Sequence, residues 1–223
     1  AFMRKIIACG GIKGELEQIR KEAGEDAPEV QYLRQDFHRA PDKLHEELQK
    51  TLDQVTSEYD QVVLGYGLCS NAVAKLKAPK QGLYIPRVHD CIAFYLGSRE
   101  KYQETFKKNP GTYYLTPTWI NNQKDPLGAM RNEYTERVGP EMAEEAMRYE
   151  IKNYSRISFI ETPHTNQRYL EKAKENADFF NKEFVVYRSN DTYFRKILFG
   201  PYNTSDFVYI EPHNNVKQQD FLK

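Results

Sequence analysis

Short apolar runs rich in β-branched residues alternate with amphipathic helical segments along most of this chain, and this alternation restricts the folds open to it. Short apolar strands separated by helices are typical of a parallel sheet that is covered on both faces. We therefore predict an α/β fold with a mostly parallel, Rossmann-like or flavodoxin-like sheet and helices on both faces. The predicted strands are Arg4–Cys9, Val30–Leu33, Gln61–Leu64, Gly82–Pro86, Thr112–Leu115, Ile157–Ile160, Phe184–Tyr187 and Phe207–Ile210.

Apolar residues at helical spacing predict the segments between the strands. Pro41 opens one helix at a position where proline is tolerated, and its buried stripe is formed by Leu44, Leu48, Leu52 and Val55. Gly97 is expected to interrupt another helix, over Cys91–Phe106. The remaining predicted helices are residues 12–23, 170–180 and 192–198.

The length of 223 residues suits a single α/β domain spanning residues 1–223. One segment, residues 121–140, is polar and punctuated by Pro126, Gly128, Gly139 and Pro140. If the domain has two lobes, we expect the boundary between them to lie in this segment. We consider this segment either a surface connection or a lid over the site.

The charge balance restricts the partners. Lys and Arg together number 32, as do Asp and Glu, so the formal net charge is +0. A neutral chain lacks the general electrostatic attraction to nucleic acid or to an anionic membrane surface, so we expect neither partner. No apolar run approaches the roughly 20 residues of a membrane-spanning helix. The chain has 3 cysteines, a small and odd number that cannot all pair in a disulfide framework, and this favours a reducing, cytoplasmic location.

The positions of the three cysteines are the most informative feature for function. Cys9 ends the first predicted strand, Cys69 follows the third and Cys91 follows the fourth. Ligands of open α/β sheets bind outside the carboxyl ends of the strands. If these three strands are neighbours, as in the flavodoxin-like order, their ends span only about 10 Å. The three thiols would then meet at one site.

Thiolates suit iron–sulfur clusters, zinc and copper(I). A structural zinc site has four protein ligands, whereas a catalytic metal keeps one position open for substrate. Three cysteines would leave an open corner on a metal or cluster, unless His89 closes it as a fourth ligand. An iron–sulfur cluster is therefore the first candidate cofactor, and zinc on the same ligands is the alternative. Each cysteine also has a plain interpretation as a small buried residue.

The loop after the third strand contains Gly65 and Gly67, followed by Ser70 and Asn71. The third glycine of a dinucleotide fingerprint and its downstream acidic residue are missing, which argues against a nicotinamide site. We predict instead that the four residues help to bind a cofactor, because glycines let backbone N–H groups approach an anion or a sulfur. A tight strand-to-helix turn explains the same glycines equally well.

Two residues near Cys91 are candidate catalytic groups. His89 could transfer a proton, lower the pKa of a thiol or ligate a metal. Arg87 could bind a substrate carboxylate or phosphate, or pair with an acidic residue on a neighbouring strand. Both predictions assume that the side chains face the thiols.

Four motifs resemble the family catalogued as domain of unknown function 1638, and with the Cys9 strand end and the closing region the resemblance covers nearly the whole chain. They are Gly65–Cys69, Pro86–Ile92, Leu96–Tyr102 and Pro110–Pro117. The resemblance implies no settled activity. It implies a setting in anaerobic metabolism beside corrinoid-dependent methyl transfer, with a corrinoid protein or methyltransferase as a partner.

Two classes of function follow from these observations. The first is a metalloprotein, in our interpretation an enzyme of one-carbon or sulfur metabolism, whose cysteines bind an iron–sulfur cluster, or zinc, that accepts a small-molecule substrate. The second is a non-catalytic accessory protein that binds a small molecule or a corrinoid and whose cysteines only pack. A thiol-dependent enzyme without metal is a further reading, and a homo-oligomer is compatible with each class.

Overall fold

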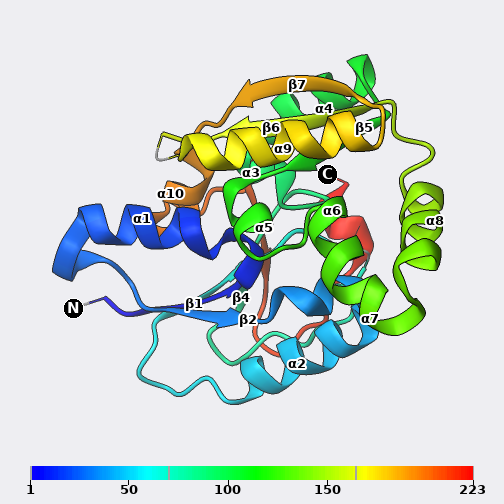
Figure 1. Cartoon of the computed structure of the whole chain (residues 1–223). Coiled ribbons are helices and arrows are strands. Elements are labelled where there is room, and N and C mark those ends of the chain that lie inside the picture. Colours follow the sequence, from blue (N-terminus) through cyan, green and yellow to red (C-terminus); the bar gives the residue numbers. More distant parts are fainter. Residues whose placement is uncertain (1, 70, 164, 223) are drawn as a thin grey trace. The chain divides into compact units, whose positions relative to one another are not determined.

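The computed structural model describes residues 2–69, 71–163 and 165–222, and these form two compact units (Figure 1). The first unit comprises Ala1–Arg99 and Asp191–Lys223, and the second comprises Glu100–Asn190. The chain thus leaves the first unit once and returns to it. The boundaries between the units lie outside residues 121–140, which belong entirely to the second unit.

The sheet of the first unit has the strand order β2-β1-β3-β4-β8. β1 pairs in parallel with β2 and β3, and β3 pairs in parallel with β4. This part has the predicted flavodoxin-like order. β8 pairs with β4 in the antiparallel direction, so the sheet is mixed and mostly parallel. The bounds are β1 Arg4–Cys9, β2 Val30–Leu33, β3 Gln61–Gly65, β4 Leu83–Pro86 and β8 Phe207–Ile210.

Helices cover both faces of this sheet, as Figure 1 shows. Leu44, Leu48 and Leu52 of α2 are buried in one cluster with Ile7 and Leu64 of the strands, as the stripe predicts. Val55, the fourth predicted residue of the stripe, lies beyond the end of the helix at Asp53 and is only partly buried. On the other face α10 packs against β3 and contacts both α1 and α3. The helices are α1 Lys13–Ala23, α2 Pro41–Asp53, α3 Ile92–Leu96 and α10 Thr192–Phe199, with 3-10 turns at Gly10–Ile12, Gly24–Asp26, Gln35–Arg39 and Gln218–Phe221.

The second unit contains a parallel sheet of order β5-β6-β7. α9 packs on β6 and β7. The break predicted at Gly97 is confirmed, because this glycine ends α3 in the left-handed conformation with φ 87°. The strands are β5 Thr112–Leu115, β6 Arg156–Glu161 and β7 Glu183–Arg188. The helices are α4 Arg99–Lys108, α5 Pro117–Asn121, α6 Pro126–Ala129, a π-helical turn Met130–Tyr134, α7 Thr135–Val138, α8 Pro140–Glu150 and α9 Gln167–Phe179.

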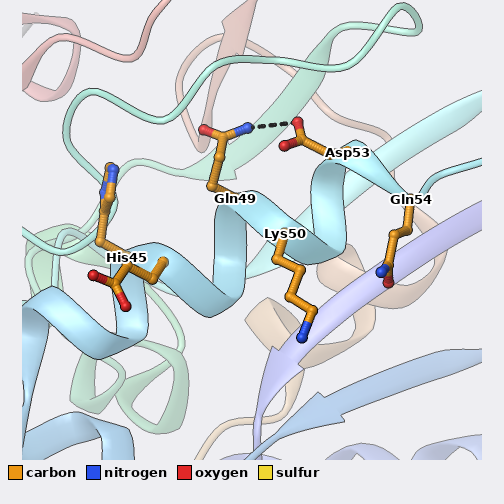
Figure 2. A pocket seen from close by; sticks show the side chains of 6 residues that line it. His45, Gln49, Lys50, Asp53 and Gln54 are labelled. Atoms are coloured by element: carbon orange, nitrogen blue, oxygen red, sulfur yellow. Dashed lines mark hydrogen bonds between the residues drawn. The ribbon is translucent and has the colours of Figure 1, made fainter.

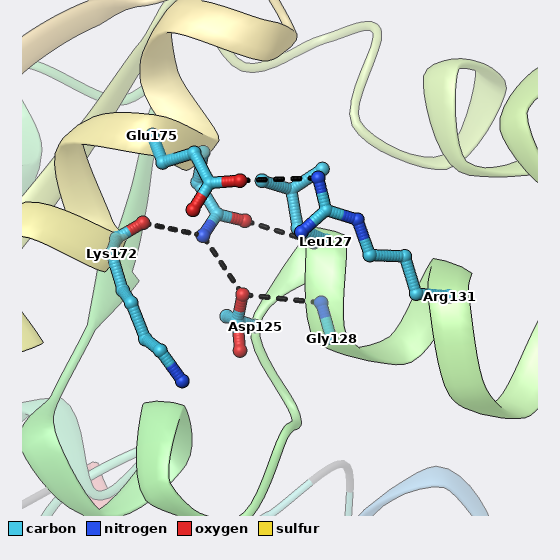
Figure 3. Close-up of polar contacts among 7 residues, drawn as sticks. Asp125, Leu127, Gly128, Arg131, Lys172 and Glu175 are labelled. Carbon is cyan, nitrogen blue, oxygen red and sulfur yellow. Dashed lines mark hydrogen bonds and ion pairs between the residues drawn. The ribbon is translucent and has the colours of Figure 1, made fainter.

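Residues 121–140 form helical turns whose apolar side chains belong to the core of the second unit, so the expectation of a merely polar surface connection is wrong, and a role as a lid stays a prediction. Leu127, Ala129 and Met130 are buried in an apolar cluster. The buried side chain of Asn176 accepts a hydrogen bond from the Leu127 N–H at 2.9 Å and donates one to the Asp125 carboxylate at 2.8 Å (Figure 3). These hydrogen bonds hold residues 121–140 against α9. Its prolines begin helices instead of excluding them, because proline is tolerated in a first helical turn.

No helix within the described part of the chain has both the length and the apolar character that a membrane span requires.

Candidate functional site

The three cysteines belong to the first unit and lie at the carboxyl edge of its sheet. Cys9 is the last residue of β1, while Cys69 and Cys91 lie in the loops that follow β3 and β4. These three strands are neighbours in the sheet, which was the condition for the thiols to meet. Cys9 and Cys69 both pack against the apolar cluster beneath α2.

Two backbone hydrogen bonds join the loops that contain Cys69 and Cys91. The Leu68 N–H donates to the Val88 carbonyl oxygen, and the Cys69 N–H donates to the His89 carbonyl oxygen, both at 3.0 Å. They continue the pairing of β3 with β4 beyond the ends of the strands. Cys69 is therefore held beside the backbone that leads directly to Cys91.

The two glycines of the first loop have steric roles within the protein. A Cβ on Gly67 would lie 2.8 Å from the Val88 carbonyl oxygen and 3.0 Å from the Asp90 nitrogen, so only glycine permits the loops to touch. A Cβ on Gly65 would lie 2.7 Å from the Cβ of Ala8 on the neighbouring strand. The turn interpretation thus accounts for both glycines, and their contact with a cofactor stays a prediction.

The other two predicted cofactor-binding residues follow Cys69. Ser70 lies outside the described residues. Asn71 is exposed and has a φ of 67°, a left-handed conformation that asparagine tolerates better than most residues. Its carbonyl oxygen accepts a hydrogen bond from the Ala74 N–H at 3.1 Å. Asn71 thus shapes the turn, and cofactor binding by this residue also stays a prediction.

The three thiols lie close enough to affect one another's ionisation. Each cysteine retains some exposed surface, yet the surrounding protein desolvates all three thiols. Burial raises the pKa of Cys69 to about 12, and the charge of Cys9 adds to this shift. Burial also raises the pKa of Cys91 well above its usual value, and the charges of Asp90, Cys9 and Cys69 act in the same direction. The three cysteines therefore lie near one another at this edge of the sheet, and their joint binding of a metal or cluster stays a prediction.

This raised pKa predicts a loss of stability in alkali. The folded protein keeps the Cys69 proton up to about pH 12, whereas an unfolded chain begins to release it near pH 9. Stability from this thiol is complete below about pH 9 and falls as pH rises toward 12, by roughly 1.4 kcal/mol per pH unit. Urea unfolding of the metal-free protein at pH 8 and pH 10 measures this effect. Cys69→Ala should lessen the alkaline loss by about 1.4 kcal/mol, and an unchanged loss in the variant would contradict the assignment.

Backbone N–H groups surround the sulfur atoms. The Gly11 N–H donates to the Cys9 Sγ at 3.3 Å across the turn that follows β1. The Gly67 N–H donates to the Cys69 thiol, which opposes the pKa rise caused by burial. The Cys91 N–H acts in the same sense on its own side chain. Such donors favour the thiolate form of a sulfur, which is the form that binds metals.

Tyr66 places a hydroxyl beside the thiols. The residue is 2% exposed, and its hydroxyl has no hydrogen-bond partner of normal geometry among the residues that the structure describes. Burial raises the pKa of Tyr66 well above its usual value, and the charges of all three thiols add to the rise. The hydroxyl therefore keeps its proton and is available as a donor. A buried hydroxyl without a hydrogen-bond partner is costly.

The two predicted catalytic residues differ in position. The Arg87 guanidinium donates to the backbone carbonyl oxygens of Thr204, Phe207 and Asp220, so it has a structural role that the sequence did not indicate. His89 is exposed, and its carbonyl oxygen accepts the bond from Cys69. The catalytic roles of both residues stay predictions.

Two further ionisable residues lie near the site. Asp90 accepts a hydrogen bond from the Ile92 N–H at 2.9 Å and raises the pKa of the neighbouring thiols. Partial burial lowers the pKa of His38, while the charge of Asp90 opposes this effect. Sequence reasoning missed His38. The signal for it was its position shortly after the strand Val30–Leu33, at the same edge of the sheet.

Within the described residues, no three side chains of His, Cys, Asp or Glu are arranged as ligands for a metal ion. The thiols are thus neighbours without forming a preorganised single-ion site. The ligands of a multinuclear cluster lie further apart than those of one ion, because they bind different metal atoms of the cluster.

An open hollow on α2 is a separate feature of the first unit (Figure 2). Two of its lining residues hold the loop that follows Cys69. The Nδ1 of His45 lies 2.9 Å from the Ala72 carbonyl oxygen, so Nδ1 is the donor, and the Gln49 side chain both donates to and accepts from the backbone of Lys77.

Comparison with known proteins gives one result. Neither the curated proteins nor the solved structures include a match to this chain. Residues 32–198 match a family described as protein of unknown function (DUF1638). The matched part includes Cys69 and Cys91 and begins after Cys9. It covers well over half of the sequence, so the chain belongs to the DUF1638 family.

Proposed function

We propose that Cys9, Cys69 and Cys91 bind an iron–sulfur cluster and leave one iron open to a small-molecule ligand. The observation that carries this proposal is the convergence of the only three cysteines of the chain at the carboxyl edge of neighbouring parallel strands. This is the edge where α/β sheets bind ligands. A random distribution of buried cysteines would not place all of them there, beside one buried tyrosine whose pKa their charges raise.

A cluster fits this site better than zinc does. Both take thiolate ligands, but a single zinc ion needs three or four donors at about 2.0–2.3 Å from one point. The described residues have no such arrangement. Three cysteines on a four-iron, four-sulfide cluster would leave the fourth iron without a protein ligand, which gives a small molecule a place to bind.

The residues around the sulfurs support thiolate ligation. Cys9 and Cys69 each accept a backbone N–H bond, which lowers the cost of placing negative charge there. The partial exposure of the cysteines leaves a route for a substrate. The open iron would act as a Lewis acid toward a small molecule with a lone-pair donor. His89 is the candidate for proton transfer from the exposed side, whereas the hydrogen bonds of Arg87 hold it in the scaffold.

The setting we propose is a reducing cytoplasm. A thiolate-bound cluster is sensitive to oxygen, and this sensitivity agrees with the resemblance-based expectation of anaerobic one-carbon metabolism. A corrinoid protein or methyltransferase as partner belongs to the same proposal.

Anaerobic purification followed by iron and acid-labile sulfide analysis tests the proposal. We expect about four iron and four sulfide per chain after reconstitution, with the broad visible absorbance of an iron–sulfur cluster. Incubation of a parallel sample with zinc alone tests the alternative. Protein that stays free of iron after reconstitution, or that retains zinc and no iron, contradicts the cluster.

A further inference from the structure

The hydroxyl of Tyr66 is the one feature near the thiols that the proposed ligation does not use. The strand register shows where it lies. Ala8 of β1 pairs with Gly65 of β3, so the next residues along the two parallel strands, Cys9 and Tyr66, are also level. Side chains alternate along strands, and Ile7 and Leu64 both belong to the cluster beneath α2. Cys9 and Tyr66 therefore face the same side as these two residues, next to each other.

The contacts agree with this register. The Tyr66 ring is part of the apolar cluster beneath α2, and Cys9 packs against the same cluster. The hydroxyl is buried and forms no bond of normal geometry with any residue that the structure describes. The charges of the three sulfurs affect the ionisation of this hydroxyl, and Cys9 lies next to Tyr66 in the strand register.

A neutral thiol is a weak acceptor, whereas a thiolate is a strong one. The Cys9 sulfur already accepts the Gly11 N–H at 3.3 Å. On loading it would gain negative charge and could accept a second, charge-assisted bond. For Cys69 and Cys91, the donors identified among the described residues are backbone N–H groups. Cys9 would thus be the most strongly hydrogen-bonded of the three ligands.

We propose that Tyr66 donates a hydrogen bond to the metal-bound Cys9 thiolate and thereby raises the reduction potential of the centre. A hydrogen bond to a ligand sulfur stabilises the more negative, reduced state. Tyr66 is thus a positioning and tuning residue that need not touch substrate. This inference rests on the proposed function and deepens it, because it assigns control of the potential to one side chain.

Potentiometric titration with dithionite, followed by electron paramagnetic resonance, measures the effect. Dithionite supplies the one electron that the centre takes up, and no bond forms or breaks in this step. Tyr66→Phe removes only the hydroxyl and should shift the midpoint potential to a more negative value. The matched control is Tyr193→Phe, which removes a buried hydroxyl that bonds to the Asp206 carbonyl oxygen. Its potential should equal that of the unaltered protein.

A second variant covers the case in which Tyr66→Phe does not hold a cluster. Incorporation of 3-fluorotyrosine at position 66 keeps the shape of the ring and makes the hydroxyl a stronger donor, so the potential should shift to a more positive value. Equal potentials in the unaltered protein and in both position-66 variants overturn the inference while leaving the cluster intact. A lack of iron and sulfide in the unaltered protein overturns the proposed function instead.

Discussion

Cys91→Ser is expected to lose at least about tenfold in bound iron after anaerobic reconstitution, compared with the unaltered chain. Changes to residues that only support metal ligands already cost about 10–100-fold in affinity, and loss of a ligand costs no less. A serine hydroxyl keeps the side-chain size but is a hard, neutral donor at pH 7, which iron in a sulfide cluster binds poorly. Iron and sulfide analysis of the desalted protein measures the loss.

The small number of cysteines provides an independent measurement. The chain has 3 cysteines, so alkylation of the unfolded, metal-free protein adds three groups that mass spectrometry can count. Loaded native protein should add none in the same time if all three thiols are ligands. Ser57→Ala, at an exposed position, is the control for the effects of substitution and handling. Full iron content in Cys91→Ser would remove this residue from the ligand set.

Gly67→Ala should lower the free energy of unfolding by roughly 3 kcal/mol, because overpacking and two strained hydrogen bonds add together. The new Cβ would lie 2.8 Å from the Val88 carbonyl oxygen and 3.0 Å from the Asp90 nitrogen. Both are backbone atoms, which cannot rotate away as the end of a side chain can. The loops must therefore separate, and the bonds of Leu68 and Cys69 to the opposite loop must lengthen. Urea unfolding monitored by circular dichroism measures the loss.

The same variant tests whether the contact between the loops builds the site. If Cys69 and Cys91 are ligands, separation of their loops should also reduce iron uptake severalfold. Gly14→Ala is the matched control, since it is the same substitution at an exposed position in α1, where alanine is favoured over glycine. It should leave stability and iron uptake unchanged or slightly improved. An equally stable Gly67→Ala protein would show that the loops can shift without cost.

Most elements of the fold could be predicted, because their signals are local. The strand Val30–Leu33 has the predicted bounds and the helix begins at Pro41 as predicted, since a short apolar run and a proline-initiated leucine stripe each specify one structure. Residues 121–140 could not be predicted in this way. Their prolines and glycines are typical of loops, and the burial of Leu127 and the bonds to Asn176 depend on residues distant in the sequence.

The location of the three cysteines was predictable from the sequence, whereas their surroundings were not. The position of each cysteine relative to a strand end can be read from the sequence, and the convergence followed from the order of the strands. Arg87 looked like a residue for binding anions, yet it donates to backbone carbonyls from the C-terminal segment, more than 100 residues away in the chain. The importance of Tyr66 was also hidden, because an aromatic residue beside a strand is usually part of a core.

The sequence by itself determined the alternation of strands and helices and put each cysteine at or after the carboxyl end of a strand, because apolar periodicity and chain-breaking residues act over a few neighbours. Only the tertiary structure decided which strands are adjacent, that β8 closes the sheet in the antiparallel direction, and that Gly67 lets two loops touch. These outcomes depend on steric fit and hydrogen bonding between segments far apart in the chain, and no local pattern encodes them.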